Sequence, residues 1–228
     1  METIKKLLGE RSKCLFFDAD KNISNNCGWI GGNAPQYFDD KVSLVNTENV
    51  EYAFYLSIEN PINPGNAISV FIPKDYDILF DNPVYPNCLI KVFEHKICDE
   101  SINSIFQSRG WDPGGDWSMT KHYLHFTEEV EEIIIDRQYS DEFDETKDEI
   151  KGSLIKFGGK PVLIQNEKYY SEELLKNGYD FVFQIDEQCY PDGLVEGNYP
   201  FSFGGLYVYG KISEKSVTNI IAGYLQYS

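Results

Sequence analysis

The stretch Trp29-Ile-Gly-Gly-Asn-Ala-Pro35 decides the predicted fold, because a similar stretch, Lys156-Phe-Gly-Gly-Lys-Pro161, returns later in the chain. At the same separation, each is followed by a β-branched and aromatic run that ends in an acid, residues 52–59 and 179–186. A glycine turn and a second run typical of a strand complete each copy. The repeated order of signals predicts an internally duplicated chain. Coincidence among common strand and turn residues is the alternative.

Strand signals outnumber helix signals. Apolar runs between Gly, Pro and Asn predict strands over 52–58, 67–72, 88–93, 154–157, 161–164, 180–185 and 206–212. Helices are expected over 3–9, over 128–136 with Thr127 as N-cap, and over 171–176 between a Ser171 cap and a Gly178 stop.

Because strands and long helices do not alternate, a doubly wound parallel sheet is disfavoured. The strand-rich pattern and the repeat predict two related sheet-containing repeats with a few short helices. Residues 1–126 form the N-terminal half with the first repeat, 127–152 an acidic helix or linker, and 153–228 the second repeat.

Composition limits the function classes. The 228 residues include 20 basic and 37 acidic side chains, a net charge of −17. This charge argues against nucleic-acid binding and against docking on anionic lipid, since both need clustered Lys and Arg. It permits a basic protein partner. No apolar run approaches the roughly 20 residues of a membrane span, and the start of the sequence lacks the apolar core of a signal peptide.

The five cysteines are odd in number and irregularly spaced, with no Cys-x-x-Cys pair. This pattern predicts free thiols in a reducing cytoplasm. His122-x-x-His125 lies in a segment expected to be extended, where a spacing of three points the rings to opposite faces. The chain also lacks a nucleophile elbow and a complete phosphate loop. We therefore predict no catalytic residues, no cofactor and no metal.

Two acidic or aromatic segments are candidate binding surfaces. The glycine-rich stretch 109–117 contains Trp111 and Trp117, together with Asp112 and Asp116. The two Trp side chains either anchor a partner or pack back on the body. Residues 128–149 hold eleven acids against two bases, which indicates a solvated segment or an electrostatic docking surface.

A third candidate site involves Glu59 and Asp186, which fall at equivalent places after the repeated strands, and Gln184. These carboxylates either face each other across a cleft between the repeats or cap turns.

Taken together, the motifs resemble the YwqG-like family, a bacterial family of unknown function. Its pattern is a Gly-Gly-x-Pro turn, a spacer, a Gln-Ile-Asn/Asp strand, and a Gly before an aromatic strand, twice in this order. The resemblance covers about residues 25–95 and 153–212. The matching motifs are Trp29-Ile-Gly-Gly-Asn-Ala-Pro35, Tyr55-Leu-Ser-Ile-Glu59, Gly65-Asn-Ala-Ile-Ser-Val-Phe-Ile72, Lys156-Phe-Gly-Gly-Lys-Pro161, Gln165, Phe183-Gln-Ile-Asp186 and Phe203-Gly-Gly-Leu-Tyr-Val-Tyr209.

The chain departs from the family pattern in three places. Ser57 stands where the family tends to have Gln, so a polar role of that position is intact only at Gln184. A Trp-Pro pair is absent from the first spacer, and the second copy lacks a Gly-Asp before its final strand. The resemblance implies an antiparallel α+β body of two related halves without established catalytic chemistry. Through the family's association with polymorphic-toxin loci, it also implies a candidate immunity protein.

The leading functional hypothesis is a non-catalytic, cytoplasmic binding protein, an immunity protein that occludes a cognate toxin. Segment 128–149, Asp112 and Asp116 steer a basic toxin surface, and Trp111, Trp117 or exposed Tyr side chains supply the anchors. The alternative is a small-molecule-binding protein or enzyme with Glu59, Gln184 and Asp186 in the cleft between repeats.

Overall fold

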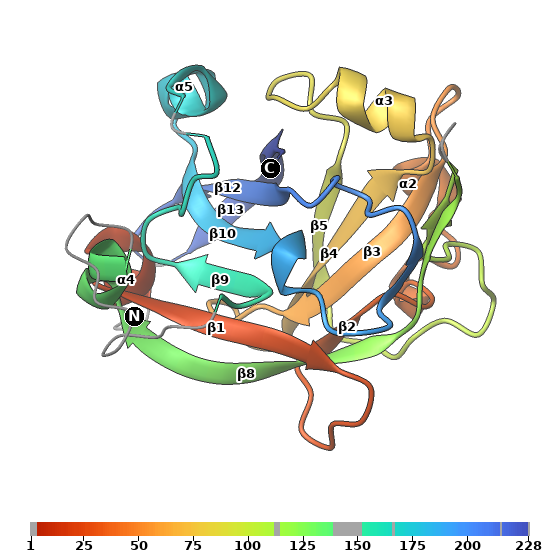
Figure 1. Cartoon of the computed structure of the whole chain (residues 1–228), viewed down its shortest axis with the longest axis horizontal. Helices are drawn as coiled ribbons and strands as arrows, with labels where there is room; N and C mark the ends of the chain where they lie inside the picture. The colour runs from red at the N-terminus through yellow and green to blue at the C-terminus, as the bar shows by residue number, and fades with distance from the viewer. Residues whose placement is uncertain (1–3, 112–114, 139–151, 166, 215, 228) are drawn as a thin grey trace.

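The computed structural model describes residues 4–111, 115–138, 152–165, 167–214 and 216–227 (Figure 1). Its large sheet has ten strands in the order β13-β12-β10-β9-β1-β8-β2-β3-β4-β5. They are β1 (Lys13–Asp20), β2 (Gly28–Ile30), β3 (Tyr52–Glu59), β4 (Asn66–Pro73), β5 (Lys91–Lys96), β8 (His122–Glu131), β9 (Ile155–Gly158), β10 (Asp180–Asp186), β12 (Gly205–Ile212) and β13 (Val217–Gln226).

A smaller sheet has the order β11-β7-β6, with β6 (Arg109–Gly110), β7 (Trp117–Met119) and β11 (Val195–Gly197). The helical elements are short: η1 (Lys5–Gly9), η2 (Gln36–Phe38), α2 (Val42–Val45), α3 (Tyr76–Asp81), α4 (Glu132–Gln138), α5 (Tyr169–Lys176) and η3 (Glu187–Cys189). The ladders in both sheets are antiparallel. The predicted α+β class, predominantly antiparallel β, is therefore confirmed.

The large sheet curls until its two ends, β5 and β13, approach within 8 Å between Cα atoms (Figure 1). No ladder between these two ends is found in the described part of the chain, so the sheet is an open barrel with a seam. Part of the β13 edge is covered by the segment around Val84, where Tyr85 N donates to Gly223 O at 2.8 Å and Leu225 N to Pro83 O at 2.8 Å.

The core fills both faces of the sheet. Tyr55, Leu56 and Ile58 of β3 pack into the central cluster, whereas Phe54 packs with Phe38 in a second cluster on the other face. This two-sided burial explains why β3 reads as a continuous apolar run rather than an alternating one. No helix of the described residues has the length and hydropathy needed to cross a membrane.

Two expected elements are wrong. Residues 161–164 are not a strand: Gln184 Oε1 accepts from Val162 N at 2.7 Å and Tyr207 Oη donates to Val162 O at 2.7 Å, which fixes a loop instead. The helix expected over 128–136 begins only at Glu132, because β1 pairs with β8 as far as Glu131. Thr127 is the extra residue of a β-bulge rather than an N-cap.

Other boundaries differ less. The strand expected over 88–93 is β5, shifted to Lys91–Lys96. The expected first helix is a π-helical turn, Lys5–Gly9. Helix α5 begins after Lys168, with Ser171 inside it, and ends before Gly178 in the left-handed region (φ 74°). Strands β1 and β13 were not predicted.

Both Gly-Gly turns place a carboxylate against the backbone. Asn33 N, after the first turn, donates to Glu100 Oε1 at 2.8 Å, and Lys160 N, after the second, donates to Glu132 Oε1 at 2.9 Å. The four glycines have φ between 63° and 80°. A Cβ on Gly159 would lie 1.9 Å from Glu132 Oε2, so this glycine is required by the close approach of the acid.

We predict that Gly159→Ala destabilises the fold by about 3 kcal/mol or more, because it displaces Glu132 from its buried ion pair with Lys156 at 3.2 Å. Gly178→Ala is the matched control, since Gly178 is also left-handed but a Cβ there meets open space. It should cost about 1–2 kcal/mol. Equal losses in chemical denaturation would contradict this explanation.

Candidate functional site

Part of the glycine-rich stretch 109–117 lies at one end of the small sheet. In register, Gly110 lies opposite Trp117, and Trp117 lies opposite Gly197. The next residues in line on the three strands are therefore at the same end: Trp111, Asp116 and Asn198. Asn198 Nδ2 donates to Gly115 O at 3.2 Å, which joins the residue after β11 to the segment before the central strand β7.

Trp111 is held by its backbone and leaves its ring on the surface. Its N–H donates to Lys74 O at 2.9 Å, and its carbonyl accepts from Tyr76 N at 3.1 Å. The side chain is 46 % exposed. A fixed backbone below an exposed indole lowers the entropy lost on binding, which suits Trp111 to act as an interface anchor.

Trp117 does not share this role. It is 2 % exposed and belongs to the central core, and a Cβ on Gly110 would lie 2.6 Å from its ring. The expectation that Trp117 is a surface anchor is therefore wrong, and the packing alternative holds. Asp116 is exposed, and Asp112 lies outside the described residues.

A second exposed aromatic side chain follows β11. Phe203 is 52 % exposed and stacks on Tyr199 with ring centroids 4.3 Å apart, and Tyr199 stacks on Tyr190 at 5.4 Å. Ser202 and Phe203 both have left-handed φ, 53° and 62°. Non-glycine residues adopt this region only where the surroundings impose it.

The buried carboxylate of Glu187 supplies that constraint. Glu187 is 1 % exposed, and its oxygens accept from Phe201 N at 2.8 Å, Phe203 N at 3.0 Å and Tyr190 Oη at 3.0 Å. Tyr190 in turn shares a hydrogen bond with the buried Tyr55 hydroxyl. Glu187 thus holds the backbone N–H groups of Phe201 and Phe203, and the backbone conformation held in this way turns the Phe203 ring outward.

No cation pairs with Glu187 among the residues described. Burial raises the pKa of the Glu187 carboxyl to about 8, while the two backbone N–H groups and the Tyr190 hydroxyl act in the opposite direction. The neighbouring Asp186 also raises it slightly through its charge. This carboxyl is therefore largely protonated at neutral pH.

The residues predicted for a cleft make separate polar contacts. Gln184 Oε1 and Nε2 both bond to the backbone of Val162, so its amide fixes a loop. Asp186 Oδ1 accepts from Gln188 N at 2.9 Å and caps η3, which positions Glu187. Glu59 is exposed at the end of β3, and within the described chain no hydrogen bond or ion pair joins it to Asp186.

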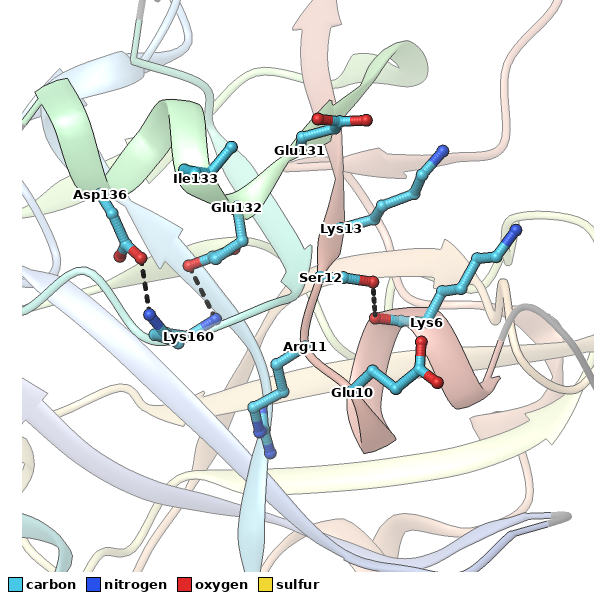
Figure 2. A pocket seen from close by; sticks show the side chains of 10 residues that line it. All are labelled: Lys6, Glu10, Arg11, Ser12, Lys13, Glu131, Glu132, Ile133, Asp136 and Lys160. Carbon is cyan, nitrogen blue, oxygen red and sulfur yellow. Dashed lines mark hydrogen bonds and ion pairs between the residues drawn. The ribbon is translucent and has the colours of Figure 1, made fainter.

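A polar pocket of about 500 Å³ lies between η1, β1 and α4 (Figure 2). Its charges are mostly paired internally: Asp136 bonds to Lys160 at 2.6 Å, and Glu132 accepts from the Lys160 backbone. Arg11, below them, pairs with Asp180 at 2.7 Å. Because these groups already have partners, the pocket stabilises the fold rather than offering charges to a ligand.

Reactive side chains are buried or neutral. Burial raises the pKa of Cys14 and Cys27 to about 11 and of Cys88 and Cys189 to about 12, so these thiols stay protonated near neutral pH. Ser69 Oγ lies 2.7 Å from His95 Nε2, a nucleophile-to-base distance. However, Ser69 is fully buried, and burial lowers the pKa of His95. The pair is therefore closed to a substrate.

Among the described residues, no group of three or more His, Cys, Asp or Glu is placed to hold a metal ion. No family model matches the chain, and a search of curated proteins finds no relative. The site must therefore be interpreted from its own geometry.

Sequence reasoning missed Glu187, Tyr199 and Phe203. The available signal was Pro200-Phe-Ser-Phe-Gly-Gly205, in which two aromatic residues precede a glycine pair beside the small sheet. The role of Glu187 had no such signal, because nothing local distinguishes it from the chain's other acids.

We predict that stability falls as pH rises from 4.5, the ordinary pKa of a glutamate, to about 8, the pKa of Glu187 in the folded state. In this window the folded protein holds a proton that the unfolded chain releases, so Glu187 removes about 1.4 kcal/mol per pH unit. Above pH 8 its effect is constant. Chemical denaturation across this range should show a flatter profile for Glu187→Gln, and an unchanged one for Glu196→Gln. The prediction fails if Glu187→Gln keeps the wild-type slope.

Proposed function

We propose that this chain is a non-catalytic protein-binding module that recognises a basic partner through Trp111 and Phe203. The observation that supports this most is Phe203, an aromatic side chain about half exposed on a left-handed backbone imposed by a buried acid. One side of the ring stacks on Tyr199, while about half of the residue stays in solvent, where a partner can reach it. Preorganised aromatic anchors are the residues that dominate protein interfaces.

The charge of the chain defines the kind of partner. With a net charge of −17, the surface attracts a cationic protein and raises its association rate. Glu196 is exposed on β11, and Asp116 is exposed directly before β7. The acids supply steering, and the aromatic side chains supply the desolvated contact.

The more specific role that we propose is that of an immunity protein, which occludes a basic toxin in the bacterial cytoplasm. The resemblance to the YwqG-like family supports this role. The five cysteines are all free and support a reducing compartment. The alternative, a small-molecule site or enzyme built on Glu59, Gln184 and Asp186, is less favoured, because Gln184 is committed to Val162.

We also propose that the two halves arose by duplication. The strand order is symmetric about the central pair: β9 matches β2, β10 matches β3, β12 matches β4 and β13 matches β5. Each Gly-Gly turn donates to a glutamate that pairs with a lysine, Glu100 with Lys121 at 2.7 Å and Glu132 with Lys156 at 3.2 Å. Matching order together with matching polar contacts supports a common origin.

The test is capture of a partner by the tagged chain from lysate of its own host, at low and high salt, read by mass spectrometry. We expect a stoichiometric basic protein whose capture weakens as salt rises. Trp111→Ala and Phe203→Ala should each weaken its binding by more than about 1 kcal/mol.

Tyr169→Ala and Leu175→Ala are the control variants, since these side chains are 55 % and 56 % exposed on α5. They should leave capture unchanged. If both the Trp111→Ala and the Phe203→Ala variants still capture the partner, the interface lies elsewhere. If the tagged chain captures no specific protein, this argues against a protein partner altogether.

A further inference from the structure

Half of β8 is an open sheet edge. β2 pairs with β8 only over His122, Tyr123 and Leu124, and beyond them β8 is flanked by β1 alone. From His125 to Glu131, no strand of the described chain pairs with the other edge of β8. In Figure 1 this part of β8 runs along the lower border of the sheet. Unpaired backbone N–H and C=O groups on such an edge can accept another strand.

The exposed side chains of this edge are acidic on both faces. Glu128 and Glu131 are exposed, and because they are three positions apart they project to opposite faces of β8. Lys13 pairs with Glu129, whereas neither Glu128 nor Glu131 has an ion pair among the described residues. An added strand would therefore meet uncompensated negative charge above and below the sheet.

These acids select between possible occupants. Edge pairing of two copies of this chain would bring Glu128, Glu129 and Glu131 of one β8 against those of the other, which like-charge repulsion disfavours. The same acids attract a strand that is rich in Lys or Arg. Phe126, which is 52 % exposed and lies beside the bulge, offers an apolar contact for the residues that lie between the basic side chains of the added strand.

We propose that the open edge of β8, from His125 to Glu131, binds an extended basic segment of another protein by β-strand addition. Backbone hydrogen bonds give the affinity, and Glu128 and Glu131 select a cationic sequence. This edge belongs to β8, whereas Trp111 follows β6 and Phe203 lies in the turn before β12. The proposal does not depend on the function proposed above.

The experiment uses a short blocked peptide of alternating Lys and Val, and the same peptide with N-methylated amides that cannot donate hydrogen bonds. Binding to the whole chain is followed by amide chemical shifts and hydrogen exchange. We expect the unmodified peptide to protect amides within 125–131, and N-methylation to weaken binding at least about tenfold. Equal binding of the two peptides would overturn the proposal, since charge attraction alone would then suffice.

A charge swap tests the selection. The double variant Glu128→Lys, Glu131→Lys should lose the Lys–Val peptide and gain a Glu–Val peptide, whereas Glu48→Lys, Glu214→Lys, an equal charge change at exposed sites elsewhere, should do neither. Protection of amides outside 125–131, or no binding of the basic peptide, would overturn the proposal. It would also be overturned if the double variant Glu128→Gln, Glu131→Gln forms dimers while the wild-type chain does not bind the peptide. This last result would mean that the acids only prevent self-pairing.

Discussion

The proposed surface depends on the hydrogen bonds that the buried carboxyl group of Glu187 accepts. This group lies in the interior, where no cation of the described residues pairs with it, and it accepts from three donors: two backbone N–H groups and one tyrosine hydroxyl. Leaving buried amides unbonded costs about 1–3 kcal/mol each. The loop from Tyr199 to Gly204 therefore has one favourable conformation around this acid, with Phe201 inside against Tyr55 and Phe203 outside.

The same physical solution recurs at the two Gly-Gly turns. There Glu100 and Glu132 satisfy backbone donors, and a lysine compensates each charge. Apolar packing sets the curled sheet, but it does not specify how loops leave the strands. Glu132 and Glu187, which are buried, and the partly exposed Glu100 perform that task, because a carboxyl group accepts several donors and tolerates few alternative geometries. Glu187 differs in that no cation of the described residues pairs with it, and its burial makes this loop sensitive to pH.

Sequence patterns could predict the strands that punctuated apolar runs define, such as β3, β10 and β12, whereas the antiparallel class was expected from the family resemblance. They failed where tertiary pairing decided the outcome. Residues 128–131 have helix-forming acids, yet pairing with β1 holds them extended. Of the two proposed anchors, Trp111 could be predicted, because a Trp in a glycine-rich loop is unusual. Phe203 could not, because its conformation depends on Glu187, whose burial follows from long-range packing alone.

Hydrogen exchange at the amides of Phe201 and Phe203 tests the central claim most directly, since both are predicted to be held by one buried carboxylate. In the wild-type chain below pH 8, we predict exchange as slow as that of β12 amides, although these two residues lie outside any strand. In Glu187→Ala both amides should exchange like an exposed loop while β12 stays protected. Fast exchange of both in the wild-type chain would contradict a preorganised Phe203 and the binding surface built on it.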